Sequence, residues 1–346
     1  MKILIIKRDK IGDMLLTTPM LQQLKQALPE AEVHVLANNY NAWVIRDNPN
    51  VDRLWIFDRV RTGKKISIPA AIRQMLLMIR LRFERYEVAI VAGGDESKRA
   101  IARARWVGAK RVIAYCSREN QPKFKLTDPL LPAPDLHEAE RMLAELAPLG
   151  IPLPAHPIAP RYTLPAQWQT FAQAWLSERG MRSGEYVVIG LGARRAKKQP
   201  TTQQILRWAS HFKRQFGLDT VFMWTPGKSD NPLYPGDDDV AQPVLDAELP
   251  FIHPFRGALM PALGLIWNAR TSIFPDSGLM HFAAASPGGV LGLFAETDVS
   301  PSPAQWGPRG MKAAYLEARK SVSELADETV LARVDQLLKS HQGLNR

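Results

Sequence analysis

The sequence predicts an α/β protein of two domains, each with a parallel β-sheet covered by helices. Short apolar runs alternate with longer segments of helical spacing through most of the chain. The alternation stops at a proline-rich segment, GIPLPAHPIAPRYTLP at 150–165, and then starts again. A length of 346 residues, with 46% hydrophobic residues, is enough for two domains that each bury a core.

In the first half, five short apolar runs have the length and composition of buried strands. They occupy residues 2–7, 32–37, 53–57, 87–92 and 111–115. Helical spacing of apolar residues predicts helices at 14–28, 68–86, 97–107 and 137–149. Pro19 lies inside the first of these helices. Either that helix begins at Asp13 and bends, or Thr18 caps a helix whose first residue is Pro19.

The second half repeats the pattern. Strands are predicted at 186–191, 220–224, 271–274 and 290–294, and helices at 167–179, 202–216, 260–269, 278–285 and 322–340. The acidic segment 229–246 is predicted to be a loop, with the Asp237–Asp239 cluster in a solvated turn. We therefore expect a domain at 1–155, a linker at 156–165, a second domain at 166–325 and a C-terminal helix segment at 326–346.

The charge of the chain points to an anionic partner. The formal net charge is +11, and residues 59–125 alone carry 17 lysines and arginines against 5 acidic residues. A phosphorylated substrate, an anionic lipid headgroup or a nucleic acid would suit this field, and a solvated surface is the plainer alternative for any single charge. Nucleic-acid binding would also need aromatic residues interleaved with the basic ones, and Trp106, Tyr115 and Phe124 are too scattered for that.

Composition disfavours several other classes of site and location. Cys116 is the single cysteine, so an internal disulfide is excluded and no disulfide partner is expected. No two histidines have the H-x-x-x-H spacing, and no metal site is predicted. No stretch approaches 18 uncharged apolar residues, and the start MKILIIKRDK is charged too early for a signal peptide. We therefore expect a cytoplasmic location.

The motif KRDKIGD at 7–13 follows the first strand directly, at the sheet edge where open α/β sheets bind ligands. The carboxylate of Asp13 has two interpretations. It is a general base for a substrate hydroxyl, or it caps the helix that follows. The basic neighbours Lys7, Arg8 and Lys10 are expected to lower the pKa of Asp13 and keep it ionised.

A second motif, FPDSGLMHFAAA at 274–285, carries a strand into a helix. Backbone amides at that helix start would suit a phosphate, and Gly278 would allow its close approach. The alternative is a cap at Asp276 or Ser277, with His281 in the core. The basic loop GLGARRAKKQP at 190–200 would suit a diphosphate, although it has no Walker or G-x-G-x-x-G pattern. Each half thus has a motif at the ligand-binding edge of its sheet, and we expect the two sheets to face a central cleft.

Together these segments resemble glycosyltransferase family 9, the heptosyltransferases of lipopolysaccharide core synthesis. The resemblance covers most of the chain and rests on an R-x-x-x-G-D…T-x-P opening at 8–19, an H-E pair at 137–138, a K-x-W-P-like loop at 197–200 and, most specifically, D-[ST]-G-x-x-H at 276–281. Two departures lie near the expected donor site. Gln199 replaces the tryptophan of K-x-W-P, and Glu296 replaces the proline of a following L-F-G-P segment.

The resemblance implies a GT-B fold of two Rossmann-like domains. It also implies inverting, metal-independent transfer of a heptose from ADP-heptose to the phosphorylated, lipid A–linked inner core of lipopolysaccharide. Asp13 would be the catalytic base, and Lys197 or its neighbour Lys198 would offset the charge of the departing diphosphate. The other donor-binding residues that it implies are Asp230 on the ribose, Asp276 on sugar hydroxyls, the amides of Ser277 and Gly278 on phosphate, and His281. ADP-heptose is a substrate, and no cofactor is implied.

The basic N-terminal half is then expected to bind the acceptor. The predicted acceptor-binding residues are Arg59, Arg61, Lys64 and Lys65. The arginines of the 68–86 helix are expected to meet anionic headgroups at the inner membrane surface; they are Arg73, Arg80, Arg82 and Arg85. Two other functions stay open: a transferase of the same fold with another nucleotide-sugar donor or acceptor, and a non-catalytic nucleic-acid-binding protein. The acceptor sugar is also left open.

Overall fold

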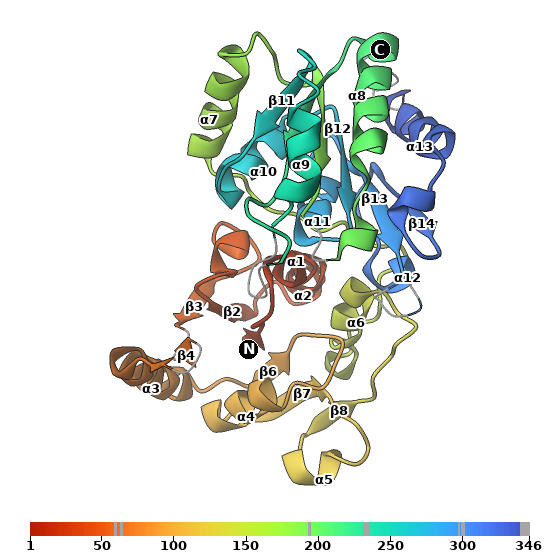
Figure 1. Ribbon diagram of the computed structural model, residues 1–346. Coiled ribbons are helices and arrows are strands. Elements are labelled where there is room, and N and C mark those ends of the chain that lie inside the picture. Colours follow the sequence, from red (N-terminus) through yellow and green to blue (C-terminus); the bar gives the residue numbers. More distant parts are fainter. Residues whose placement is uncertain are drawn as a thin grey trace. The chain divides into compact units, whose positions relative to one another are not determined.

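The computed structural model describes residues 1–58, 61–62, 65–192, 195–230, 236–296, 298 and 302–339. The chain divides into two compact units, Met1–Thr163 and Leu164–Arg346. Each unit contains a six-stranded sheet whose strand pairs are all parallel (Figure 1). The strands of both sheets follow the order third, second, first, fourth, fifth, sixth along their own unit, which is the order of a dinucleotide-binding doubly wound sheet.

The sheet of unit 1 is built around its first strand. Its members are β3 (Arg53–Phe57), β2 (Glu32–Asn38), β1 (Lys2–Ile6), β6 (Val88–Val91), β7 (Arg111–Tyr115) and β8 (Asp128–Leu130). The helices of this unit are α1 (Ile11–Leu15), α2 (Thr18–Ala27), α3 (Ile68–Phe83), α4 (Lys98–Val107), α5 (Gln121–Phe124) and α6 (Glu138–Ala144), with short 3₁₀ turns η1 (Ala42–Ile45) and η2 (Ala147–Leu149). A small antiparallel pair, β4 (Arg61–Thr62) and β5 (Lys65–Ile66), precedes α3.

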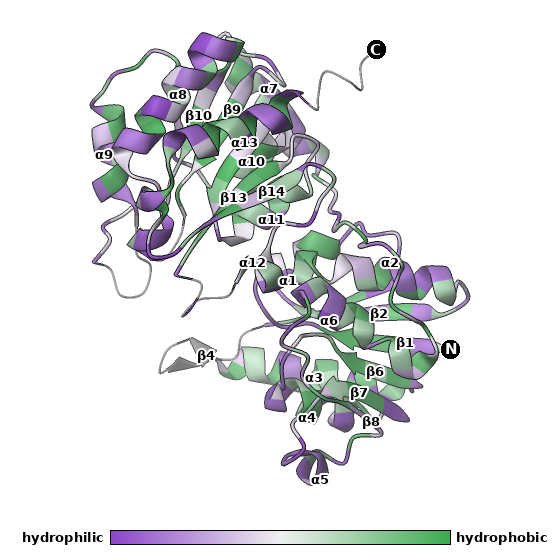
Figure 2. Ribbon diagram, turned by 90° about the vertical axis from the view of Figure 1, so that its right-hand side faces the viewer, coloured by the Kyte–Doolittle hydropathy of each residue, from purple (hydrophilic) through white to green (hydrophobic). Residues whose placement is uncertain are grey.

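Alternate residues of β1 face opposite layers of helices, because side chains alternate along a strand. Leu4 and Ile6 pack in one core cluster with residues of α3 and α4, such as Leu81 and Ile101. On the other side of the sheet, α2 packs against α6 (Figure 1). The central strands of both units are strongly hydrophobic (Figure 2), as expected for strands that are buried on two faces.

The helical segment after β1 is two helices rather than one. Thr17 is the N-cap of α2, Thr18 is its first residue, and Pro19 lies in the first turn. Both predicted alternatives were therefore wrong: the chain does not continue as a bent helix, and Thr18 is not the cap. Proline is tolerated in the first turn because its missing N–H has no partner there within the helix.

Unit 2 has the same architecture. Its strands are β11 (Ile252–Phe255), β10 (Asp219–Met223), β9 (Tyr186–Gly190), β12 (Thr271–Pro275), β13 (Val290–Ala295) and β14 (Ala313–Ala318). Its helices are α7 (Ala166–Ser177), α8 (Thr202–Phe216), α9 (Asp238–Leu245), α10 (Leu259–Trp267), α11 (Gly278–Ala284), α12 (Pro303–Trp306) and α13 (Asp327–Lys339), with η3 (Ala196–Lys198) and η4 (Val322–Glu324). Trp208 and Phe212 of α8 share a core cluster with Val330 and Val334 of α13, so the last helix is part of this core.

Two strands of unit 2 were not predicted, and both lie at an edge of the sheet. β11 contains Pro254, which cannot donate a ladder hydrogen bond and is therefore confined to edge strands. β14 mixes buried and exposed positions, so it lacks the continuous apolar run of the central strands.

The acidic segment 229–246 is not simply a loop, because α9 begins at Asp238. Asp237, predicted to lie in a solvated turn, is only 5% exposed. One of its carboxylate oxygens accepts hydrogen bonds from the backbone N–H of Gly192 (3.1 Å) and of Thr225 (2.9 Å). The other accepts from Nε2 of Gln199 at 2.5 Å. A single carboxylate thus ties the chain after β9 and the chain after β10 to the loop that carries η3.

We expect Asp237→Ala to lower the free energy of unfolding by about 2–4 kcal/mol, because it leaves buried donors without an acceptor. Urea denaturation followed by tryptophan fluorescence measures this. Asp239→Ala is the matched control, since Asp239 is exposed and, among the described residues, bonds only to the Ser229 hydroxyl; its effect should stay within about 0.5 kcal/mol. Equal effects of the two substitutions would contradict the structural role of Asp237.

Candidate functional site

Polar side chains gather where the first strand of unit 1 ends. Lys7 follows β1 directly and is only 1% exposed, with its Nζ 3.1 Å from Oδ2 of Asp9. Burial alone would lower the pKa of the Lys7 ammonium group. The nearby carboxylates of Asp9, Asp13 and Glu138 outweigh that effect, and the pKa lies above its ordinary value. Lys7 is therefore a fixed positive charge inside this sheet edge.

Asp13 lies in the first turn of α1, where its Oδ2 accepts a hydrogen bond from the backbone N–H of Lys10 at 3.2 Å. It is the third residue of the helix and not its N-cap. The prediction that basic neighbours lower the pKa of Asp13 is wrong. Burial raises that pKa and outweighs the opposing charges of Lys7 and Lys10. A carboxylate with a raised pKa is a stronger base than an ordinary aspartate.

Two buried glutamates complete this cluster, and the sequence analysis gave neither of them a role. Oε1 of Glu138 accepts from the N–H of Gly94 at 3.0 Å, and Oε1 of Glu145 accepts from the N–H of Gly93 at 3.4 Å. Burial raises the pKa of Glu138 and raises that of Glu145 well above its usual range. The signal for Glu138 in the sequence is the pair His137-Glu138 at the start of a predicted helix, and its burial needed coordinates.

Gly94 is required for this arrangement. A Cβ atom added there would lie 2.3 Å from Cδ of Arg141 and 2.4 Å from Oε2 of Glu138. The double glycine after β6 thus lets α6 bring its acidic residues close to the end of the sheet, within the electrostatic range of Lys7.

The corresponding edge of unit 2 holds a buried ion pair. Lys198 of η3 is buried, and its Nζ pairs with Oδ2 of Asp276 at the end of β12. Lys197 has a different environment: its side chain is 64% exposed, and its Nζ lies 3.1 Å from Oε1 of Glu296. The structure therefore distinguishes the two lysines that the sequence left equivalent, because Lys198 is the one beside Asp276.

Two polar side chains follow Asp276 at the start of α11. Ser277 is the N-cap residue of α11, and its hydroxyl has no partner among the described residues. His281 is buried in that helix, and its Nδ1 likewise has no partner in the described part of the chain. Burial lowers the pKa of His281 to about 4, so the imidazole is neutral at physiological pH. It can hydrogen-bond a ligand but adds no positive charge.

Of the remaining predicted donor- and acceptor-binding residues, Asp230 is the one whose side chain the structure describes. Asp230 is exposed in a turn beyond β10. Arg59 and Lys64 lie outside the described residues, as does Arg194 of the basic loop. For Arg61 and Lys65 the structure gives only the backbone strands β4 and β5.

Within the described ranges, no group of three or more histidine, cysteine, aspartate or glutamate side chains could hold a metal ion. The described helices also include none with the length and apolar character needed to cross a membrane.

Comparison with known proteins assigns the chain to a family and a fold. A model of the family described as glycosyltransferase family 9 (heptosyltransferase) matches residues 75–331. The chain is 28% identical over 300 residues to lipopolysaccharide heptosyltransferase 3 of Escherichia coli, covering 83% of this chain and 81% of the relative.

Two solved structures resemble the whole chain. A family 9 glycosyl transferase from Veillonella parvula has a TM-score of 0.78 at 22% identity, covering 98% of this chain and 97% of its own. The Escherichia coli ADP-heptose lps heptosyltransferase II has a TM-score of 0.74 at 18% identity, covering 99% and 100%. Likeness at this level shows the fold, which is GT-B as the sequence predicted.

Proposed function

Because the chain belongs to glycosyltransferase family 9, the heptosyltransferases, we propose that this glycosyltransferase moves a heptose from ADP-heptose to the phosphorylated inner core of lipopolysaccharide. The names of its relatives, a lipopolysaccharide heptosyltransferase and an ADP-heptose heptosyltransferase, support this choice of donor and acceptor. The observation that carries the proposal is the buried Lys198–Asp276 pair beside a helix start with unpartnered polar atoms.

In this proposal unit 2 binds the donor. Lys198 offsets the negative charge that develops on the diphosphate as it leaves. Stabilising charge that develops in the transition state is usually the largest single contribution to catalysis. Asp276 accepts hydrogen bonds from sugar hydroxyls, the amides of Ser277 and Gly278 bind phosphate, and neutral His281 donates or accepts one further hydrogen bond. Asp230 is the proposed ribose contact.

Asp13 is the proposed base. The acceptor hydroxyl gives its proton to the Asp13 carboxylate while its oxygen forms the new bond to the anomeric carbon. The bond from that carbon to the diphosphate breaks on the opposite face, so the configuration inverts. In this proposal Lys198 supplies the positive charge that stabilises the departing diphosphate, and the transfer is metal-independent. The proposal requires Asp13 and the donor site to meet across a cleft in the working enzyme.

The acceptor is assigned to unit 1 because the basic excess of the chain lies there. Arg59, Arg61, Lys64 and Lys65 are the proposed acceptor-binding residues. Arg80, Arg82 and Arg85 are exposed on α3 or just after it, and Arg73 is exposed although it pairs with Asp58 at 3.0 Å. We assign these arginines to the anionic cytoplasmic face of the inner membrane.

A transferase of the same fold with a different nucleotide sugar is the second candidate, and Glu296 is the observation that favours it. Glu296 has a left-handed backbone (φ 56°) and holds the side chains of Lys197 and Arg195, at 3.1 Å and 3.8 Å. It stands where the family's L-F-G-P segment has its proline, so the charge and shape of this part of the proposed donor site depart from the family pattern. Turnover of ADP-heptose compared with other ADP- and UDP-sugars separates the two candidates.

Asp13→Asn should lower kcat for heptose transfer by about 10²–10⁴-fold, because an amide cannot accept the acceptor's proton. The control is Asp135→Asn, which makes the same change at an exposed aspartate of unit 1 outside this cluster. Its kcat should fall by less than about tenfold. Full transfer by the Asp13 variant would refute its role as base.

The activity should depend on pH through the same residue. A general base works only when deprotonated, so transfer is lost as the pH falls through the pKa of Asp13, which burial sets above that of an ordinary aspartate. The Lys10 charge opposes this rise, so Lys10→Gln should move the acidic limb of the kcat/KM profile to higher pH. Lys25→Gln, where the lysine pairs with Asp52 instead, should leave it unchanged. If the acidic limb does not move in Lys10→Gln, that limb does not report the ionisation of Asp13.

The two lysines of η3 should differ sharply. Lys198→Gln keeps a hydrogen-bond donor for Asp276 but removes the charge, and it should lower kcat by about 10²–10³-fold. Lys197→Gln changes an exposed side chain, and its kcat should stay within about threefold of the natural enzyme. Steady-state kinetics with saturating donor measures both values. A larger loss in Lys197→Gln would reverse the assignment.

A further inference from the structure

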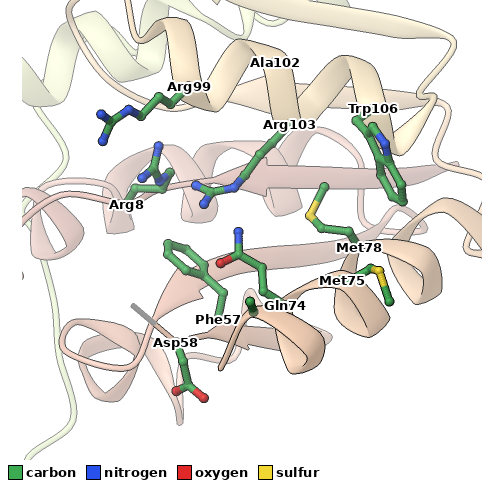
Figure 3. A pocket seen from close by; sticks show the side chains of 11 residues that line it. Arg8, Phe57, Asp58, Gln74, Met75, Met78, Arg99, Ala102, Arg103 and Trp106 are labelled. Atoms are coloured by element: carbon green, nitrogen blue, oxygen red, sulfur yellow. The ribbon is translucent and has the colours of Figure 1, made fainter. Parts of the chain in front are cut away.

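Unit 1 contains a pocket of about 830 Å³ between α3 and α4. None of its lining residues is proposed above as the base or as a donor or acceptor contact, although Asp58 adjoins Arg59 in the sequence. Its two ends differ in chemistry (Figure 3). The guanidinium groups of Arg8, Arg99 and Arg103 gather at one end, beside the ring of Phe57. Met75, Met78 and Trp106 line the other end. The volume lies within the roughly 300–1,000 Å³ of small-molecule sites.

The cationic end lacks the partners that buried charges usually have. Nε of Arg8 and Nη1 of Arg103 are buried and have no hydrogen-bond partner among the described residues. Burial, together with the neighbouring charges of Arg8 and Arg99, lowers the pKa of Arg103 to about 10. The carboxylate of the pocket, Asp58, is engaged by Arg73 at 3.0 Å. Arg8 and Arg103 are half-buried and Arg99 is exposed. An anion placed among them would supply the acceptor that the buried nitrogen atoms of Arg8 and Arg103 lack.

The ring of Phe57 positions Arg8 and Arg103 without neutralising them. Cζ of Arg103 lies 4.6 Å from the centroid of Phe57, and Cζ of Arg8 lies 5.6 Å from it. Cation–π contacts of this kind hold a guanidinium group in place and leave its N–H groups available. The N–H groups of Arg8 and Arg103 are thus preorganised for an oxygen-rich anion such as phosphate.

The apolar end continues onto an exposed hydrophobic surface. Met75 is 55% exposed and Trp106 is 44% exposed, although both border the pocket. On the outer side of α3 further large apolar residues are exposed: Ile68, Ile72, Leu76, Ile79 and Phe83. A contiguous apolar surface of this kind marks a contact with another apolar phase or partner. A free anion would gain nothing from this apolar end of the pocket, whereas a hydrocarbon chain would pack against it.

We propose that the pocket between α3 and α4 binds one anionic lipid, with a phosphate headgroup on Arg8, Arg99 and Arg103 and a hydrocarbon chain along Met75, Met78 and Trp106. Charge complementarity fixes the headgroup end, and the apolar lining fixes the direction of the chain. The site goes beyond the proposed transfer reaction, uses no donor-binding residue, and is a place for a single lipid molecule rather than a general attraction to a charged surface.

Isothermal titration of the full chain with dodecyl phosphate, below its critical micelle concentration and without donor, tests this proposal. Dodecyl maltoside has the same chain with an uncharged head, and inorganic phosphate has the charge without a chain. We expect dodecyl phosphate to bind, and each of the other two probes to bind at least about tenfold more weakly, because each lacks half of the recognised chemistry.

Two substitutions locate the binding. Arg103→Gln and Met78→Gln should each weaken dodecyl phosphate binding by at least about tenfold, since they remove a headgroup contact and a chain contact. Arg105→Gln is the matched control, because Arg105 is exposed on the same helix and does not line the pocket; its effect should stay within about twofold. Circular dichroism checks that each variant is folded. If Arg103→Gln fails to fold, Met78→Gln and the three probes still decide.

Three outcomes would overturn the proposal. Dodecyl phosphate does not bind the natural chain. Arg103→Gln and Arg105→Gln weaken binding equally, which identifies a general surface attraction. Inorganic phosphate binds as tightly as dodecyl phosphate and Met78→Gln has no effect, which identifies a site for a free anion. None of these results depends on heptose transfer, so the lipid site and the proposed activity stand or fall separately.

Discussion

A buried ammonium group held by carboxylates is the interaction on which both candidate half-sites depend. In unit 1, Lys7 follows the central strand β1 and lies among Asp9, Asp13 and Glu138. In unit 2, Lys198 follows the equivalent strand β9 and pairs with Asp276. A lysine removed from water is tolerated only with such partners. The pairing therefore fixes the positions of the loops that carry these residues, as well as the positions of the charges.

The two lysines have different consequences for their neighbours. Lys7 interacts with several carboxyl groups. At Asp13 the effect of burial outweighs the attraction to Lys7, and the pKa of Asp13 is raised. Lys198 has one close acidic partner in Asp276, and the adjacent His281 is kept neutral by its own burial. Unit 1 thus holds a carboxylate suited to accepting a proton, while unit 2 holds a localised positive charge suited to a phosphate.

The sequence predicted the central strands of both sheets well, because continuous apolar runs are a direct consequence of burial on two faces. It failed at edge strands such as β11, where Pro254 obscures the pattern. Motif spacing located Asp13 and Asp276 at strand ends, but spacing carries no information about burial. The pKa of Asp13, the choice between Lys197 and Lys198, and the structural role of Asp237 all follow from burial and therefore needed coordinates.

Each unit closes its own hydrophobic core. The cluster around Leu4 and Ile101 uses residues of unit 1 alone, and the cluster around Trp208 and Val334 uses residues of unit 2 alone. A substitution inside either cluster is therefore felt first by side chains of its own unit. Compensating changes for a repacked core can then arise within the same half of the chain.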